Sequence, residues 1–183
     1  MIKFNTTEEF SSHIVDGETF YYINDTEVTP EIYHKRLKAF KQRQIDLRYL
    51  RMAHIWAENS YAQKLQVGAL IVKNRSIISD GYNGTPSGFD NTCEYLLPDG
   101  SLKTYPEVLH AEANAILKLS RSTNSAEGAT LYVTDSPCFN CAKLIIQAGI
   151  VRVVYNRQYR LNDGIELLKK AGIEVVQLDI DLV

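Results

Sequence analysis

The spacing of hydrophobic residues changes along the chain, and each change marks an expected element. Residues 31–59 contain no Gly or Pro, and their apolar side chains recur at the intervals of a helix. Thr29 and Pro30 suit its N-cap and first turn. Two apolar rows predict that its second half is buried, whereas its first half is basic. Upstream, residues 19–23 are typical of a short strand that the turn-forming Asn24-Asp25 closes.

Beyond residue 59 the pattern favours strands first and then alternating strands and helices. Residues 65–72 and 76–79 are β-branched or apolar runs on either side of Lys73-Asn74-Arg75, which predicts two neighbouring antiparallel strands. Residues 81–100 are rich in Gly, Pro and polar side chains, so we expect a long ordered loop. The rest of the chain alternates helices at 110–121, 137–148 and 163–171 with strands at 130–134, 151–155 and 173–178.

These elements together predict the architecture. Strands that alternate with helices form parallel pairs joined by right-handed crossovers. Added to the antiparallel pair upstream, they predict an α/β protein, a three-layer α/β/α sandwich with a mixed five-stranded sheet. We expect an N-terminal extension, residues 1–44, that ends in the basic helix, followed by one domain over residues 45–183.

Composition narrows the class of protein. The 183 residues suffice for one domain with its own core, and 45% hydrophobic with 23% charged residues is typical of neither a disordered nor a collagen-like chain. A net charge of −2 argues against a polycation that binds nucleic acid over its whole surface. We expect a cytoplasmic protein that does not engage membranes, because the sequence lacks an apolar run of about 18 residues and the blocks of a signal peptide.

Three residues have the spacing and chemistry of zinc ligands. Cys138 and Cys141 stand three apart in what we expect to be a first helical turn, with Ser136 as N-cap and Pro137 as the first helical residue. His110 opens the preceding expected helix. One imidazole and two thiolates leave the fourth position of a tetrahedral zinc open for water, whose pKa falls to about 7. Glu112 would lie near that water without being a ligand and would act as a general acid and base.

Two plainer interpretations compete with a catalytic zinc. Cys-x-x-Cys can be a redox pair or half of a structural zinc site. A redox pair needs no His-x-Glu element, and a structural site needs a fourth ligand rather than a spare carboxylate. The conjunction of His110-x-Glu112 with Pro137-Cys138-x-x-Cys141 matches the signature of zinc-dependent nucleobase deaminases.

From about residue 48 to residue 178 the sequence resembles the cytidine and deoxycytidylate deaminase superfamily, and within it the deoxycytidylate deaminases. The supporting runs are Gln66-Val67-Gly68-Ala69, Gly81-Tyr82-Asn83-Gly84-Thr85-Pro86-Ser87-Gly88, His110-Ala111-Glu112-Ala113-Asn114-Ala115-Ile116 and Ser136-Pro137-Cys138-Phe139-Asn140-Cys141-Ala142-Lys143. The resemblance implies a cytidine deaminase-like fold and hydrolysis of dCMP to dUMP and ammonia, which supplies dUMP for thymidylate synthesis. It also implies that His110, Cys138 and Cys141 hold Zn²⁺ and that Glu112 moves the protons.

The resemblance further implies substrate contacts. The main-chain amide of Ala111 would pair with the carbonyl of the base, Asn83 would meet the sugar, and Tyr159 would contact the substrate. Plainer alternatives are a turn residue at Asn83 and a surface aromatic at Tyr159. The phosphate needs cations or main-chain donors, for which Lys64, Arg157 and Arg160 are candidates.

Some relatives carry a second, structural zinc, but this chain has only Cys93 to spare, so we expect one zinc per chain and a free thiol at Cys93. Several relatives are hexamers that dCTP and dTTP regulate together with Mg²⁺. The resemblance therefore implies a homo-oligomer, of which a hexamer is one form. It also implies a regulatory role for Arg121, although arginines at helix ends are usually only solvated.

An RNA-directed enzyme is the alternative within the same chemistry. A tRNA adenosine deaminase, or another nucleobase deaminase, would show the same zinc site, whereas a free cytidine deaminase typically has Cys where His110 stands. Residues 35–51 hold seven Lys or Arg against Asp46 alone, which favours RNA, but a solvated helix face explains such a run more simply. We expect a small nucleotide as the partner and not a nucleic acid.

Overall fold

The computed structural model describes residues 8–180. These residues divide into two compact units, one built from residues 8–48 with Ile180 and the other from Tyr49–Asp179. The helix α1 (Pro30–Ala57) belongs in part to each unit. The sequence predicts an extension up to residue 44 and a deaminase-like domain from residue 45. That division into an extension and a functional domain stays a prediction.

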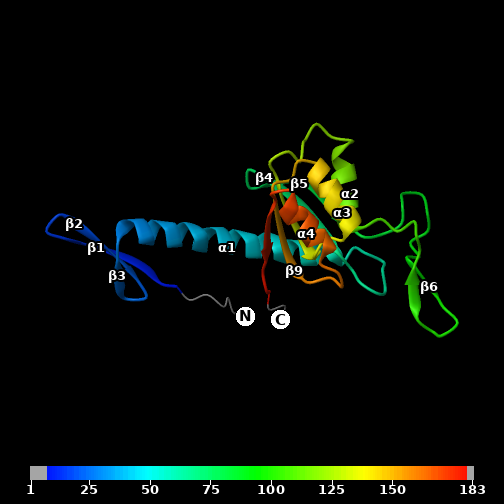
Figure 1. Ribbon diagram of the computed structural model, residues 1–183, viewed down its shortest axis with the longest axis horizontal. Helices are drawn as coiled ribbons and strands as arrows, with labels where there is room; N and C mark the ends of the chain where they lie inside the picture. Colours follow the sequence, from blue (N-terminus) through cyan, green and yellow to red (C-terminus); the bar gives the residue numbers. More distant parts are fainter. Residues whose placement is uncertain (1–7, 181–183) are drawn as a thin grey trace. The chain divides into compact units, whose positions relative to one another are not determined.

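The first unit is a three-stranded antiparallel sheet against the start of α1 (Figure 1). It contains β1 (Phe10–Val15), β2 (Glu18–Ile23) and β3 (Thr26–Val28). Asn24 and Asp25 both have positive φ, which a two-residue hairpin turn requires, so the expected strand and turn are confirmed. The strand β1 was not expected from the sequence. Phe10 and Tyr21 contact Tyr33 of α1, and Phe10 also contacts Phe40.

The second unit contains the predicted mixed sheet of five strands in the order β10-β9-β8-β4-β5. The strands are β4 (Gly68–Lys73), β5 (Ser76–Tyr82), β8 (Thr130–Asp135), β9 (Arg152–Arg157) and β10 (Glu174–Gln177). The strand β4 runs antiparallel to both β5 and β8, and β8, β9 and β10 are parallel. The predicted fold class is therefore confirmed.

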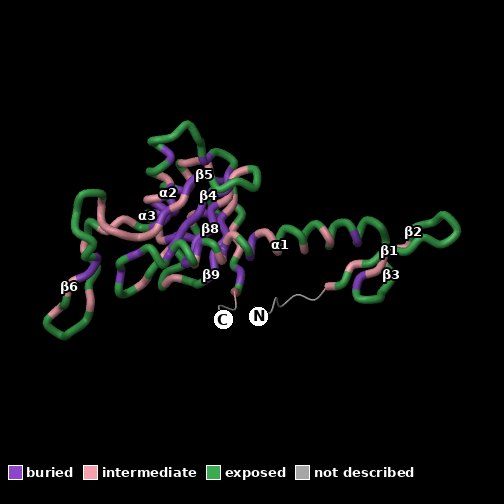
Figure 2. Tube along the Cα trace, turned by 180° about the vertical axis from the view of Figure 1, so that it is seen from behind, coloured by how far each residue is buried: buried purple, intermediate pink, exposed green. Residues whose placement is uncertain are grey.

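Helices cover both faces of this sheet. One face carries α2 (Ala111–Leu119), α3 (Phe139–Gln147) and α4 (Asp163–Lys170), and the part of α1 from Tyr49 onward lies on the other (Figure 1). Neighbouring register positions show the two faces: Gly81 touches the backbone of α2, whereas Gly68 touches that of α1. The buried residues of β4, β8 and β9 lie between these layers (Figure 2).

The substitution Gly81→Ala is expected to lower the free energy of unfolding by about 1–3 kcal/mol. A Cβ at this position would overlap main-chain atoms of Ala111 and Ala115, which cannot move without displacing α2. The measurement is the urea midpoint. Gly84→Ala is the control, because a Cβ there meets open space and the midpoint should stay or rise slightly. Equal midpoints for the two variants would contradict the close packing of α2 on β5.

His54, on α1, is expected to make the stability of the protein depend on pH. His54 Nε2 lies 3.1 Å from the Asn156 side-chain oxygen, and burial, followed by the Arg157 charge, lowers the pKa of His54. Because the folded protein binds this proton less readily than the unfolded chain, the stability from a neutral His54 is present above the unfolded pKa of about 6.5. It is lost as the pH falls through the lower folded pKa.

We therefore expect the urea midpoint of the unaltered protein to fall between pH 7.5 and pH 5.5 by more than that of His54→Gln. Glutamine keeps a donor for Asn156 but does not titrate. The two midpoints would be compared at each pH in one buffer series. An identical pH dependence in both proteins would show that His54 does not contribute.

Two expectations about local structure were wrong. Residues 81–100 are not one loop, because β6 (Glu94–Leu96) pairs with β7 (Leu102–Thr104) in a hairpin with Tyr95 against Tyr105. The strands are too short to show a period of two. The helix α3 begins at Phe139 rather than at Pro137, with Cys138 as its N-cap, and the Ser136 side chain bonds elsewhere. Among residues 8–180, no helix combines the length and apolar character needed to cross a membrane.

Candidate active site

The ends of two secondary-structure elements bring the three expected zinc ligands together. His110 is the N-cap of α2, Cys138 is the N-cap of α3, and Cys141 lies in the first turn of α3. His110 Nδ1 lies 3.5 Å from the sulfur of Cys138 and 3.4 Å from that of Cys141, and the three ligand atoms are all within 4.8 Å of one another. A tetrahedral zinc separates a nitrogen from a sulfur ligand by roughly 3.5 Å. The donor set therefore fits Zn²⁺ in both type and spacing.

One of the two cysteines, Cys138, carries the negative charge that suits a cation. The pKa of Cys138 is lowered to about 3, first because Cys141 donates a hydrogen bond to its sulfur and further because of the bond with His110. The Cys138 thiolate in turn raises the pKa of Cys141. Both sulfurs lie at the N-terminal end of α3, where the helix dipole favours negative charge.

Glu112 lies beside the ligands but is not among them. It is in the first turn of α2, only 4% exposed, and burial raises the pKa of its carboxyl group. Its own main-chain amide, the His110 charge and the Cys141 side chain lower this pKa, but burial outweighs them. A buried carboxyl with a raised pKa holds a proton readily and can deliver it, which suits a general acid and base.

These residues open into a cavity of about 340 Å³. His110, Ala111, Glu112 and Cys138 line it together with two other predicted contacts, Asn83 and Tyr159. Of the three candidate cations, Lys64 and Arg160 line the cavity. Arg157 does not, and its guanidinium is paired with Asp135 at 2.8 Å. The structure thus favours Lys64 and Arg160 for contact with an anionic group.

Asn83 does more than the sequence indicated. Its side-chain oxygen accepts a hydrogen bond from the Val67 amide at 2.8 Å, and its Nδ2 donates to the Leu65 carbonyl at 2.9 Å. The Asn83 amide therefore shapes the cavity wall at Leu65 and Val67, which themselves line it.

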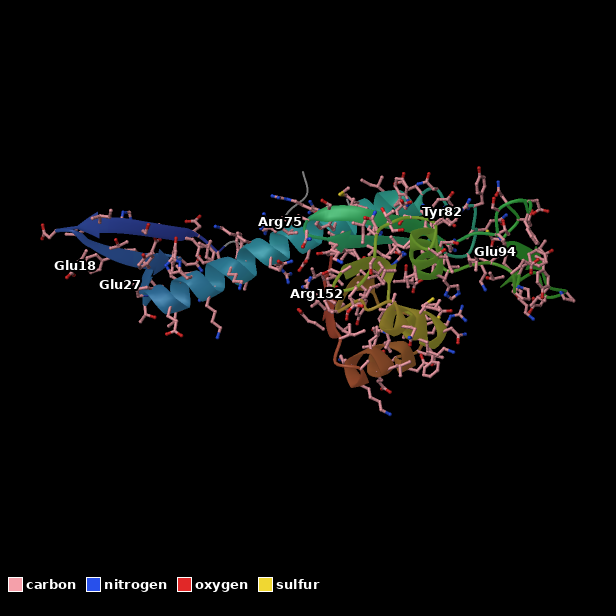
Figure 3. All side chains as sticks on the ribbon, turned by 90° about the horizontal axis from the view of Figure 1, so that it is seen from above. Glu18, Glu27, Arg75, Tyr82, Glu94 and Arg152 are labelled. Atoms are coloured by element: carbon pink, nitrogen blue, oxygen red, sulfur yellow. The ribbon has the colours of Figure 1, made fainter. Side chains whose placement is uncertain are left out.

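Other lining residues were missed by the sequence analysis. Glu94, labelled in Figure 3, and Thr104 are cross-strand partners in the β6–β7 hairpin. Glu94 accepts a hydrogen bond from the Gln63 amide at 3.0 Å. Asp135, Ser136 and Gln158 also line the cavity. Because Asp135 and Ser136 come just before the cysteines in the sequence, they could have been predicted to line the cavity. No local sequence pattern predicted that the β6–β7 hairpin would also line it.

Arg121 lies apart from this cavity. It lines a second cavity of about 580 Å³ with Lys118 and the glycine-rich segment around Gly84 and Gly88. Cys93 borders the same cavity as a free, buried cysteine, and burial raises the pKa of its thiol. The predicted regulatory residue is thus near a cavity, but not the one that holds the metal ligands.

Comparison with known proteins agrees with this arrangement. Residues 43–157 match the model of the cytidine and deoxycytidylate deaminase zinc-binding region. The chain belongs to this family. It is 36% identical over 165 residues to the deoxycytidylate deaminase of Enterobacteria phage T4, and the match covers 69% of this chain and 86% of the phage protein. It is also 38% identical over 138 residues to ComE operon protein 2 of Bacillus subtilis, covering 73% of this chain and 70% of that protein.

The structure is also similar to that of a solved member of this family. The crystal structure of dCMP deaminase from the cyanophage S-TIM5 in complex with dCMP and dUMP superposes with a TM-score of 0.67 at 42% identity. The match covers 82% of this chain and 99% of the cyanophage chain. The protein is therefore a deaminase of the zinc-binding family with a His-Cys-Cys cluster for Zn²⁺, as the sequence predicted.

Proposed function

We propose that this protein hydrolyses dCMP to dUMP and ammonia and so supplies dUMP for thymidylate synthesis. The convergence of His110, Cys138 and Cys141 beside the buried Glu112, in a cavity that also presents Lys64 and Arg160, carries the proposal. The relatives named deoxycytidylate deaminase and the cyanophage structure with dCMP and dUMP support this substrate.

Glu112 is the residue that moves protons in this proposal. His110, Cys138 and Cys141 would hold a zinc ion, which would supply a water acidified to a pKa of about 7. Glu112 accepts a proton from the attacking water and delivers it to N3 of cytosine as C4 is attacked. It then takes the remaining proton from the oxygen now bonded to C4 and transfers it to the amino group. The C4–N bond breaks, ammonia leaves, and the oxygen becomes the C4 carbonyl of dUMP. Glu112 lines the cavity beside His110 and Cys138, so one buried carboxyl group is placed for both steps.

The remaining cavity residues orient the nucleotide. The N–H of Ala111 is in the first turn of α2, where main-chain donors have no partner within the helix, and it donates to the base carbonyl. Asn83 uses one Nδ2 hydrogen for Leu65 and offers the other to the sugar. Tyr159 contacts the substrate, and Lys64 and Arg160 bind the phosphate.

Ammonia release from dCMP, CMP, deoxycytidine and a tRNA anticodon stem-loop tests the proposal. We expect dCMP to be used with the highest kcat/KM. The stem-loop is included because the first half of α1 is basic and largely exposed. Ammonia from the RNA and none from dCMP would overturn the proposal in favour of a tRNA adenosine deaminase.

We also propose that each chain binds one zinc and that the protein is cytoplasmic. We propose a homo-oligomer, of which a hexamer is one form. Each chain would consist of an extension at residues 1–44 and a deaminase domain at residues 45–183. Thiolate ligands persist best in a reducing compartment. Metal analysis and light scattering measure the zinc content and the assembly.

The second cavity supports binding of a regulatory nucleotide with Mg²⁺, because the Arg121 guanidinium there can meet a phosphate group, whereas Lys118 is paired with Asp80 at 2.6 Å. Titration of dCTP and dTTP with Mg²⁺ during dCMP turnover tests this site, and a flat response would remove it.

A further inference from the structure

Ser136 connects the segment that carries the metal-binding cysteines to residues after β9 that also line the cavity. It is 4% exposed and stands between β8 and Cys138. Its hydroxyl oxygen accepts a hydrogen bond from the Tyr159 amide at 2.8 Å and another from the Gln158 side-chain nitrogen at 3.1 Å. Its own amide donates to the Arg157 carbonyl at 2.8 Å. Ser136 is therefore joined by two hydrogen bonds to the start of the loop that follows β9 and by a third to the last residue of β9.

That loop carries residues expected to hold the nucleotide. Gln158, Tyr159 and Arg160, called here the 158–160 loop, follow β9 and line the cavity. The Tyr155 hydroxyl donates to the Gln158 side-chain oxygen at 3.0 Å, so the Gln158 amide is held on both sides. The 158–160 loop lies outside the regular strand pairing, which ends at Asp135 and Arg157. Its position consequently depends on side-chain bonds.

A local explanation for Ser136 does not fit. A serine just before a helix commonly caps the helix with its side chain. Here the N-cap of α3 is Cys138, with an extended backbone, and the Ser136 oxygen accepts its bonds from a loop 22 and 23 residues away in sequence. The neighbouring Asp135–Arg157 ion pair joins the same two strand ends.

We propose that Ser136 is a positioning residue that sets the 158–160 loop, and with it Tyr159 and Arg160, at a defined place relative to the metal ligands. Ser136 then controls binding of the nucleotide and its phosphate rather than the proton transfers of Glu112. This inference rests on the proposed function for its substrate, but not for the geometry of the loop.

The substitution Ser136→Ala removes the acceptor and leaves the Tyr159 amide without its partner. Loss of one such buried hydrogen bond corresponds to an effect of about tenfold or more. We expect KM for dCMP to rise by about that factor and kcat to change by less than about threefold. KM for deoxycytidine, which has no phosphate for Arg160, should change less than KM for dCMP. Ser136→Thr, which keeps the hydroxyl, should restore KM for dCMP.

The matched control is Ser79→Ala. Ser79 is also a buried serine, and its hydroxyl donates to the Ala115 carbonyl at 2.6 Å, away from the 158–160 loop. It should lower the urea midpoint without raising KM for dCMP. Gln158→Ala, at an exposed position, removes the second bond to Ser136 and should raise KM in the same direction if Ser136→Ala does not fold.

Hydrogen exchange of the amides at 157–161 in the zinc-loaded protein without substrate provides a measurement that does not depend on turnover. We expect about tenfold faster exchange in Ser136→Ala than in the unaltered protein, and no change in Ser79→Ala. If the unaltered protein does not turn over dCMP, the proposed function fails while this measurement still tests the loop. Unchanged exchange, or equal rises in KM for dCMP and deoxycytidine, would overturn the role of Ser136.

Discussion

Glu112→Gln is expected to lower kcat for dCMP by about 10²–10⁴-fold while leaving zinc bound at the same stoichiometry. Glutamine has nearly the shape of glutamate but can neither accept the proton of the water nor release one to the base. The ligand atoms of His110, Cys138 and Cys141 converge on one another without Glu112, so metal binding should persist. Steady-state ammonia release and metal analysis of the same preparation measure the two effects.

Glu166→Gln is the matched control for this substitution. Glu166 is an exposed glutamate in the first turn of α4, away from the cavity, and the change should leave kcat unaltered. If Glu112→Gln retained full turnover, Glu112 would not be the proton carrier. An indifferent Glu112 together with bound zinc would instead indicate a structural metal module.

Cys141→Ser is expected to have the second large effect, the loss of zinc and with it at least about 10²-fold of activity. Serine oxygen is a poor substitute for a thiolate because zinc ligands must be deprotonated, and a serine hydroxyl resists this. Cys141 is 3% exposed and close to both other ligand atoms, so no neighbouring water replaces it easily. Zinc content, turnover and the urea midpoint should fall together.

Cys93→Ser separates loss of a ligand from loss of a buried cysteine. Cys93 is 2% exposed, yet it borders the second cavity and is not part of the ligand cluster. This variant should keep its zinc and most of its turnover. Equal zinc loss in both variants would mean that general destabilisation, and not ligation by Cys141, explains the result. Zinc retained in Cys141→Ser at full activity would contradict the cluster itself.

Prediction from the sequence was accurate for features that depend on residues close together in the sequence and less accurate for features that depend on distant residues. The helix opening at His110 is local, and the spacing of Cys138 and Cys141 within one turn follows from helix geometry, although α3 begins two residues later than expected. The β6–β7 hairpin was missed because strands of three residues show no period. Ser136 was misassigned because its local alternative, a helix cap, is common, whereas its partners in the structure follow another strand.

The same distinction applies to the cavity. The sequence alone predicted the cluster of His110, Cys138 and Cys141 and the mixed five-stranded sheet with its helices, because short spacings and hydrophobic periods record them. The role of Glu112 as proton carrier stays a prediction. Only the tertiary structure showed that Arg157 pairs with Asp135, that Lys64 and Arg160 reach the cavity, and that Asn83 holds Leu65 and Val67. These outcomes depend on which chain segments meet across the sheet, and a polar side chain bonds to whichever partner the folded backbone brings within about 3 Å.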